Sequence, residues 1–199
     1  MLAAGRGLRF GGEAPKLPLE LGGRALVLRA VDAARTSGLA PIVVVVSDDR
    51  VATVLGADVE SGDLQLVRND APDRGISSSL QVALRALEPD SSVEAAVVGL
   101  ADQPLVGGEA YRRVASAYDG GAQLAVATYA GVRGNPVLVG RAHWDEALEL
   151  GGDAGARVLL RRHGAVEVPC DGTGEPTDVD TPEDLVALEK VWRSQTASE

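Results

Sequence analysis

The sequence has little of several residue types, and each shortage excludes a class of protein. A single cysteine, Cys170, excludes an internal disulfide and a zinc site made of cysteines. Aromatic residues make up only 3% of the chain, so leucine, valine, isoleucine and alanine have to fill the core. The most apolar run, residues 42–46, has the length of a strand and not of a membrane span. No secretory signal pattern follows Met1, and we therefore expect a cytoplasmic protein without membrane contact.

Basic residues are also few. The chain has 19 lysines and arginines against 29 acidic residues, which gives a formal net charge of −10. This balance argues against nucleic-acid binding, because affinity for a duplex rests on clustered positive charge. A small phosphorylated ligand needs only a local group of donors or a metal ion. Since the only lysines are Lys16 and Lys190, the position of Lys16 after a glycine-rich segment is informative.

Short apolar runs alternate with segments in which apolar residues recur at helical spacing. The strand-like runs are residues 42–46, 64–67, 95–100, 124–129, 136–139 and 166–168. The runs at 124–129 and 136–139 are predicted to form a strand pair joined through residues 131–134. The helix-like segments are residues 26–34, 77–87, 111–118, 143–150 and 154–162, and a further helix that Thr181 caps with Pro182 and Asp184. The alternation predicts an α/β fold with three layers, in which helices cover both faces of a mostly parallel sheet.

The length and the 45% hydrophobic content support one substantial domain, since a chain of this size buries about 70% of its unfolded surface. We expect a single domain over residues 1–193 and a loose tail over 194–199, because no linker or repeat interrupts the chain. Only four residues, Met1 to Ala4, precede the first glycine, Gly5. The first strand is therefore predicted to be very short or clipped.

A glycine-rich segment, residues 2–12, leads from this strand to Lys16. Glycines let the backbone approach an anion, and Arg9 and Lys16 add positive charge, so the segment is a candidate for binding nucleotide phosphates. It matches neither common phosphate motif, because Phe10 stands where a dinucleotide fingerprint needs glycine and Glu13 where a Walker A motif needs lysine. An ordinary surface turn with solvated basic residues is the alternative.

Acidic residues stand at two further places. Asp102 follows the strand predicted at 95–100, where a carboxylate reaches the ligand edge of an α/β sheet. Asp178 and Asp180 lie two residues apart before the last helix, so in an extended segment both point to the same side. Such oxygens suit Mg²⁺. Turn formation by Asp102 and interaction of the other pair with the helix dipole are the alternatives.

A polar loop opens the helix predicted at 77–87. Asn69 precedes it, and Ser77, Ser78 and Ser79 form its first turn, so amide and hydroxyl groups are available to a base or a phosphate. Ser77 is equally suited to cap the helix.

Two tight turns carry candidates for binding a second substrate. Asn135 lies in one, and Asp153 and Arg157 lie in the other, although either turn can be purely structural. His143 and His163 have no ligand-like neighbours in the sequence, and we interpret both as ordinary histidines.

Taken together, six motifs resemble, in the same order, those of the MobA-like nucleotidyltransferase family. They are LAAGRGLRFGG with Lys16 (residues 2–16), GISSSL (75–80), DQP (102–104), GNPVL (134–138), GDAGAR (152–157) and DVDTP (178–182). The resemblance spans Leu2 to Leu188 and is strongest to the molybdopterin cytidylyltransferase branch. That branch has Ala-Ala-Gly where this chain has Ala3-Ala4-Gly5, whereas the guanylyl-transferring branch usually has Ala-Gly-Gly.

The resemblance implies a Rossmann-like fold of the nucleotide-diphospho-sugar transferase type. It also implies Mg²⁺-dependent transfer of a nucleoside monophosphate from an NTP, with CTP favoured over GTP, to a phosphorylated pterin such as molybdopterin. A molybdoenzyme or its chaperone would be the protein partner. The residues carried over are Leu2, Ala3, Ala4, Gly5, Gly7, Arg9, Lys16, Asn69, Ser77, Ser78 and Ser79 for the NTP, Asn135, Asp153 and Arg157 for the acceptor, and Asp102 and Asp180 for Mg²⁺. Arg9, Lys16 and Asp102 would be catalytic by neutralising charge.

Three other activities stay open. A nucleotidylyltransferase for a sugar phosphate or an alcohol phosphate would share the same residues. An oxidoreductase acting on a pigment-like heterocycle is described among MobA-like sequences, although Phe10 argues against a nicotinamide cofactor. A non-catalytic module that binds a nucleotide or a cofactor is the third.

Overall fold

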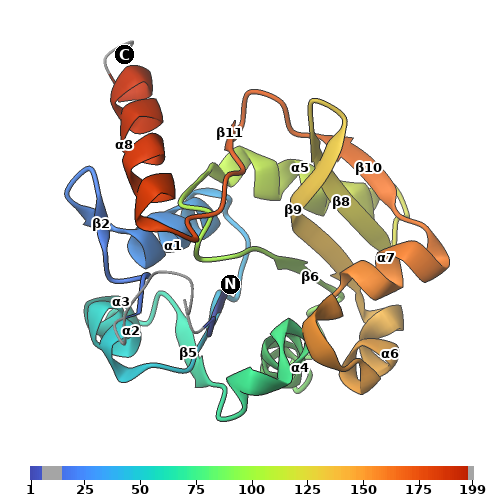
Figure 1. Cartoon of the computed structure of the whole chain (residues 1–199). Coiled ribbons are helices and arrows are strands. Elements are labelled where there is room, and N and C mark those ends of the chain that lie inside the picture. Colours follow the sequence, from blue (N-terminus) through green and yellow to red (C-terminus); the bar gives the residue numbers. More distant parts are fainter. Residues whose placement is uncertain (6–14, 197–199) are drawn as a thin grey trace.

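Two sheets that meet at Leu2 form the centre of the molecule (Figure 1). The structure is a computed structural model and describes residues 1–5 and 15–196. The strands are β1 (Leu2–Ala3), β2 (Glu20–Leu21), β3 (Arg24–Ala25), β4 (Val43–Val46), β5 (Gln65–Arg68), β6 (Ala95–Val98), β7 (Leu105–Val106), β8 (Leu124–Tyr129), β9 (Val132–Gly140), β10 (Val166–Pro169) and β11 (Gly174–Glu175). The α-helices are α1 (Leu26–Thr36), α2 (Asp49–Val54), α3 (Gly56–Glu60), α4 (Ile76–Leu87), α5 (Gly108–Asp119), α6 (Trp144–Glu149), α7 (Arg157–His163) and α8 (Pro182–Thr196). In the described part of the chain, short 3₁₀ helices are η2 (Pro72–Arg74), η3 (Arg141–His143) and η4 (Gly152–Ala154).

The described strands pair in both directions, which corrects the expectation of a mostly parallel sheet. β1, β4 and β5 are parallel and β10 is parallel to β8, but β9 runs antiparallel to both β8 and β6. The reason is a tight turn at Ala130 and Gly131, both with positive φ, which returns the chain directly beside β8. The N–H of Leu2 donates to Gly99 O at 2.9 Å, and this contact joins the two sheets through β1.

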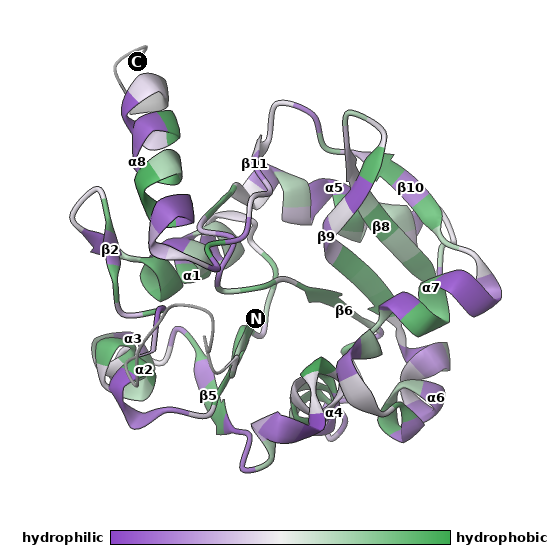
Figure 2. Cartoon of the chain, in the orientation of Figure 1, coloured by the Kyte–Doolittle hydropathy of each residue, from purple (hydrophilic) through white to green (hydrophobic). Residues whose placement is uncertain are grey.

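Helices cover both faces of the central sheets, as expected. In β4, Val43 and Val45 pack in the cluster that contains residues of α4, whereas Val44 and Val46 pack in the cluster that contains residues of α1. α6 and α7 share the face of α4, and α5 packs on the other face of β8. Strands buried on both faces have to be apolar along their whole length, and Figure 2 shows them as the green centre of the molecule.

Most predicted elements are present with shifted ends. α7 begins at Arg157 because the preceding residues form η4, and β9 begins at Val132, so that Asn135 lies inside a strand and not in a turn. α8 continues to Thr196, three residues into the stretch expected to be a loose tail. The short helices α2 and α3 were not predicted. No helix in the described part of the chain is long and apolar enough to cross a membrane.

Candidate functional site

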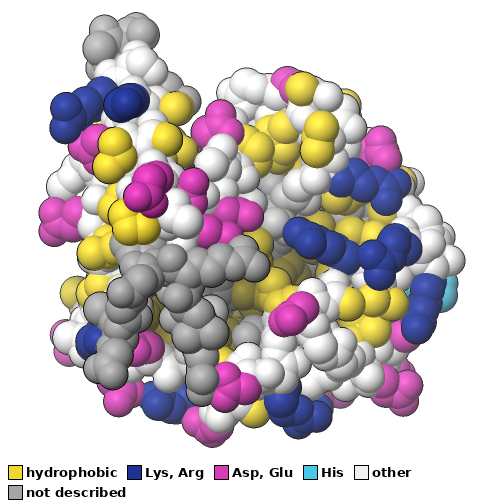
Figure 3. Space-filling view, in the orientation of Figure 1, with side chains coloured by type: hydrophobic (Ala, Val, Ile, Leu, Met, Phe, Trp, Pro, Cys, Tyr) yellow, Lys and Arg dark blue, Asp and Glu magenta, His cyan; other side chains and the backbone are white. Residues whose placement is uncertain are grey.

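A cavity of about 500 Å³, which we call the cleft, lies at the ends of β1 and β6. Eight of the predicted site residues line it: Leu2, Gly5, Lys16, Asp102, Asn135, Asp153, Arg157 and Asp180. The other lining residues include the apolar side chains of Ile76, Leu80, Val98, Leu100 and Val137. Figure 3 shows a hollow with an apolar floor, with basic side chains on one side and acidic side chains on the other.

Lys16 joins the two predicted metal ligands. Its Nζ lies 2.8 Å from Asp102 Oδ2 and 2.8 Å from Asp180 Oδ1, although these residues are 86 and 164 positions away in the chain. Lys16 is only 5% exposed, whereas the side chains of Asp102 and Asp180 are 26% and 41% exposed. The acids therefore converge on one point, and a buried ammonium group stands between them.

The charges of this cluster favour a protonated Lys16 and the binding of a cation. Burial alone would lower the pKa of Lys16, but its ion pairs and hydrogen bonds with Asp102 and Asp180 outweigh burial and raise that pKa. Desolvation, followed by the negative charge of Asp102, raises the pKa of Asp178. Three acids against one lysine leave an excess of negative charge. Their oxygen donors are the ligands that Mg²⁺ and Mn²⁺ prefer, so the residues present fit such an ion.

The backbone fixes the position of Asp180. The N–H of the buried Val179 donates to Asp102 O at 2.9 Å, which ties the two acid-bearing segments together. The N–H groups of Asp180 and Thr181 donate to Asp184 Oδ2 at 3.0 and 2.8 Å, and the N–H of Asp184 donates to Thr181 Oγ1 at 3.2 Å. This reciprocal pattern confirms the predicted capping box at the start of α8.

The opposite wall carries the predicted acceptor residues. The register of β8 and β9 shifts between Val126 and Thr128, and Asn135 belongs to the extra residues of β9 at this bulge. Bulges redirect side chains, and here one accompanies a residue that lines the cleft. Arg157 begins α7 and is exposed, and it forms no ion pair within the described part of the chain. Asp153 lies in η4 and is also exposed.

The segment that carries Asp153 rests on the start of α4. Gly75 has a φ of +85°, and a Cβ there would lie 2.5 Å from both Asp153 Oδ1 and Gly152 O. The N–H of Gly155 donates to Ser77 Oγ at 3.1 Å. The absence of a side chain at Gly75 therefore lets this segment approach the helix closely.

Asn69 and the three serines hold a loop together in the structure. Asn69 Nδ2 donates to Ser78 Oγ and to Ser79 Oγ, both at 2.9 Å, and all four side chains are buried. None of them is among the described residues that line the cleft. Ser77 does not cap α4, whose N-cap is Gly75. A role of these residues in nucleotide binding stays a prediction.

The remaining predicted residues divide into two groups. Gly7 and Arg9 lie outside the described residues. Ala3 and Ala4 are buried in the core next to the cleft, where they can shape its wall only through the backbone. Apolar residues such as Leu80 could not be predicted to line the cleft, because their helical spacing is the same as that of core residues.

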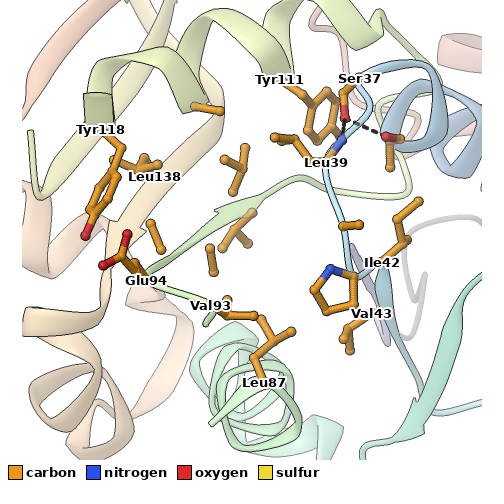
Figure 4. A pocket seen from close by; sticks show the side chains of 18 of the residues that line it. Ser37, Leu39, Ile42, Val43, Leu87, Val93, Glu94, Tyr111, Tyr118 and Leu138 are labelled. Carbon is orange, nitrogen blue, oxygen red and sulfur yellow. Dashed lines mark hydrogen bonds between the residues drawn. The ribbon is translucent and has the colours of Figure 1, made fainter. Parts of the chain in front are cut away.

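A second cavity of about 690 Å³ is larger but lacks this chemistry (Figure 4). It lies between α4 and α5, where β4 and β6 begin, and residues such as Leu87, Val93 and Leu138 make its lining largely apolar. Apart from Leu2, it contains none of the predicted site residues. The cleft is therefore the candidate site.

Comparisons with known proteins agree with this arrangement. The sequence model of the MobA-like NTP transferase domain matches residues 1–168, a range that ends before Asp180. The structure of Rv0371c from Mycobacterium tuberculosis H37Rv superimposes with a TM-score of 0.79 and 29% identity over 95% of both chains. A structure of the same protein in complex with manganese superimposes with a TM-score of 0.71 and 27% identity, again over 95% of both chains.

Curated relatives match over part of their own length. The bifunctional protein GlmU of Kineococcus radiotolerans is 36% identical over 71% of this chain and 28% of its own length. A 2-C-methyl-D-erythritol 4-phosphate cytidylyltransferase of Frankia casuarinae is 38% identical over 58% of this chain and 41% of its own length. The chain thus matches less than half the length of either relative.

Proposed function

Because this chain belongs to the family of MobA-like NTP transferase domains, we propose that it transfers a nucleoside monophosphate from an NTP to a phosphorylated acceptor. The observation that carries the proposal is the position of Lys16 between Asp102 and Asp180, on a cleft that Arg157 also lines. One wall of the cleft thus offers oxygen ligands and a cation, and the other offers a guanidinium group.

In the proposed reaction an oxygen of the acceptor phosphate attacks the α-phosphorus of the NTP. A new P–O bond forms to the acceptor, the bond from the α-phosphorus to the oxygen bridging to the β-phosphorus breaks, and pyrophosphate leaves with the electron pair. The chain needs no covalent nucleophile for this step. It has to hold both phosphates in line and neutralise the charge that develops.

In this proposal the wall with Lys16, Asp102 and Asp180, which we call the acidic wall, binds the triphosphate of the NTP. Asp102 and Asp180 would hold Mg²⁺, which supplies charge neutralisation at the phosphates when it is bound. Lys16 keeps both carboxylates directed at one point before substrates arrive, and its raised pKa keeps it protonated at neutral pH. Arg9 stays a predicted partner of the phosphates, outside the described residues.

In this proposal the opposite wall binds the acceptor. Arg157 can bind an acceptor phosphate through two parallel hydrogen bonds, and the Asn135 amide can pair with a heterocycle edge. We favour CTP as donor and a molybdopterin-type acceptor, because Ala3-Ala4-Gly5 and the GDAGAR turn at 152–157 resemble the cytidylyl-transferring branch. A molybdoenzyme or its chaperone would then take up the product.

A second acceptor class is supported by the relative that is named as a cytidylyltransferase for an alcohol phosphate. Such an acceptor would use the same acidic wall and the same guanidinium group. The two candidates therefore differ only in what Asn135 and Asp153 contact.

The test is pyrophosphate release by the full chain with Mg²⁺ and each of CTP, GTP, ATP and UTP, in the presence of molybdopterin, an alcohol phosphate or a sugar phosphate. We expect release with CTP and molybdopterin. Release with an alcohol phosphate or a sugar phosphate alone would assign the second class. Saturable NTP binding without release for any acceptor would contradict the transferase and favour a non-catalytic module.

A further inference from the structure

The two histidines of the chain lie together, and neither is among the described residues that line the cleft. His143 ends η3 and His163 ends α7, and their ring centroids are 4.8 Å apart. Glu146 of α6 lies beside them, with its Oε2 2.6 Å from His163 Nε2. One ligand atom from each of the three residues lies within 4.8 Å of the other two. The interpretation of both as ordinary histidines rested on the sequence, in which these three residues are not neighbours, and only the fold brings them together.

The local structure explains how the three side chains meet. His143 precedes Glu146 by three positions at the start of α6, a spacing that places two side chains on the same face of a helix. His163 comes from the end of α7, beyond the segment that carries Asp153 and Arg157 into the cleft. The cluster thus connects the start of α6 to the end of α7.

The chemistry of the cluster is that of a transition-metal site. Imidazole nitrogen and carboxylate oxygen are ligands of Zn²⁺, and sites with three protein ligands leave a position open to solvent. Arg162 Nη1 donates to Glu146 Oε1 at 2.8 Å, which leaves Oε2 on the side of His163. Hydrogen bonds from Arg162 and His163 lower the pKa of Glu146 and keep it ionised.

We propose that His143, Glu146 and His163 bind one Zn²⁺ or a similar imidazole-preferring cation, which fastens α7 to α6. Ligand atoms of Zn²⁺ stand about 3.4 Å apart, so the three ligand atoms have to approach one another by at most about 1.4 Å, and all three side chains are at least partly exposed and able to do so. Bound metal would restrain the segment between the two helices. The positive charge of Arg162 beside the site limits the affinity.

The test is calorimetric titration of ZnCl₂ into the full chain, free of any tag and stripped of metal, compared with the variant His143→Ala/His163→Ala. Since the acids of the cleft also attract cations, the decisive quantity is the difference between the two proteins. We expect the wild type to bind one equivalent more than the variant. At a Zn²⁺ concentration of about five times Kd, mass action should raise the Tm of the wild type by about 2–4 °C more than that of the variant.

Three further variants test whether the additional Zn²⁺ site belongs to this cluster. Glu146→Gln should weaken the additional Zn²⁺ site at least about tenfold, whereas Glu149→Gln, an exposed acid on the same helix, should leave it unchanged. Arg161→Ala, at an exposed residue of α7 two positions before His163, should also leave the affinity of this site for Zn²⁺ unchanged. Equal numbers of Zn²⁺ sites with equal affinity in the wild type and the double-histidine variant would overturn the proposal and leave a plain ion pair between His163 and Glu146.

Discussion

The two walls of the cleft are built differently. On the acidic wall, Lys16 is buried between two carboxylates, and backbone hydrogen bonds fix both acid-bearing segments. On the opposite wall, Asp153 and Arg157 are exposed and lie on short elements that rest on α4. Fixed charge suits a reaction centre that is the same for every NTP, because preorganised groups need no rearrangement in the transition state. Exposed side chains on short elements suit discrimination among acceptors.

The largest expected effect comes from breaking the acidic wall. Asp102→Asn keeps the size of the side chain but removes a charged ligand, and it should lower kcat about 10²–10³-fold while the protein stays folded. Pyrophosphate release and thermal unfolding measure the two quantities. Asp119→Asn, the same change at the end of α5 beside the second cavity, should leave kcat unchanged. Equal activity of Asp102→Asn and wild type would remove Asp102 from the mechanism.

The opposite wall should respond in KM. Arg157→Gln removes one charge-assisted contact with the acceptor and should raise KM for the acceptor about 10–100-fold, with little change in KM for the NTP. Steady-state kinetics with each substrate varied separately measures both constants. Arg161→Gln on the same helix is the control. A rise in KM for the NTP alone would place the nucleotide, and not the acceptor, on this wall.

The close contact that supports the opposite wall, between Gly75 and the segment of Gly152 and Asp153, can be changed without altering a charged residue. Gly75→Ala should destabilise the protein by about 1–3 kcal/mol, because it combines a positive φ with a clash against Gly152 and Asp153. Gly62 has a similar φ of +78° but open space around it. Gly62→Ala should therefore destabilise the protein only through its unfavourable backbone conformation. Denaturant unfolding of both variants isolates the contribution of the clash. Equal losses would show that the segment moves away freely.

The sequence allowed prediction of most elements and of eight residues that share the cleft, among them acids that follow strands and therefore reach the same edge of a sheet. It did not show that Lys16 lies buried between Asp102 and Asp180, since that pairing joins residues 86 and 164 positions apart. The strand pair of β8 and β9 was predicted from the turn between them, but the pairing of β9 with β6 was not, since these strands are distant in the chain.

The smallest expected effect is a change in stability, and it comes from replacing the buried lysine. Lys16→Met leaves two carboxylates without their shared partner and should destabilise the protein by about 1–2 kcal/mol, a discounted value because both acids are partly exposed. The pKa of Lys16 is raised, so its pairing stabilises fully below the ordinary value of 10.5 and is lost as pH rises through the higher folded value. Lys16→Met should lack this loss at alkaline pH. The control variant Lys190→Met, at the exposed lysine of α8, should still lose stability at alkaline pH as the wild type does.

The most direct test of the central claim is binding of Mn²⁺, followed by electron paramagnetic resonance, in the presence of a CTP analogue that cannot be cleaved between its α- and β-phosphorus atoms. The wild type should bind one Mn²⁺ together with the nucleotide, and Asp102→Asn/Asp180→Asn should lose it. Binding of Mn²⁺ with unchanged affinity in that double variant would show that these acids do not hold the ion, and would contradict the account.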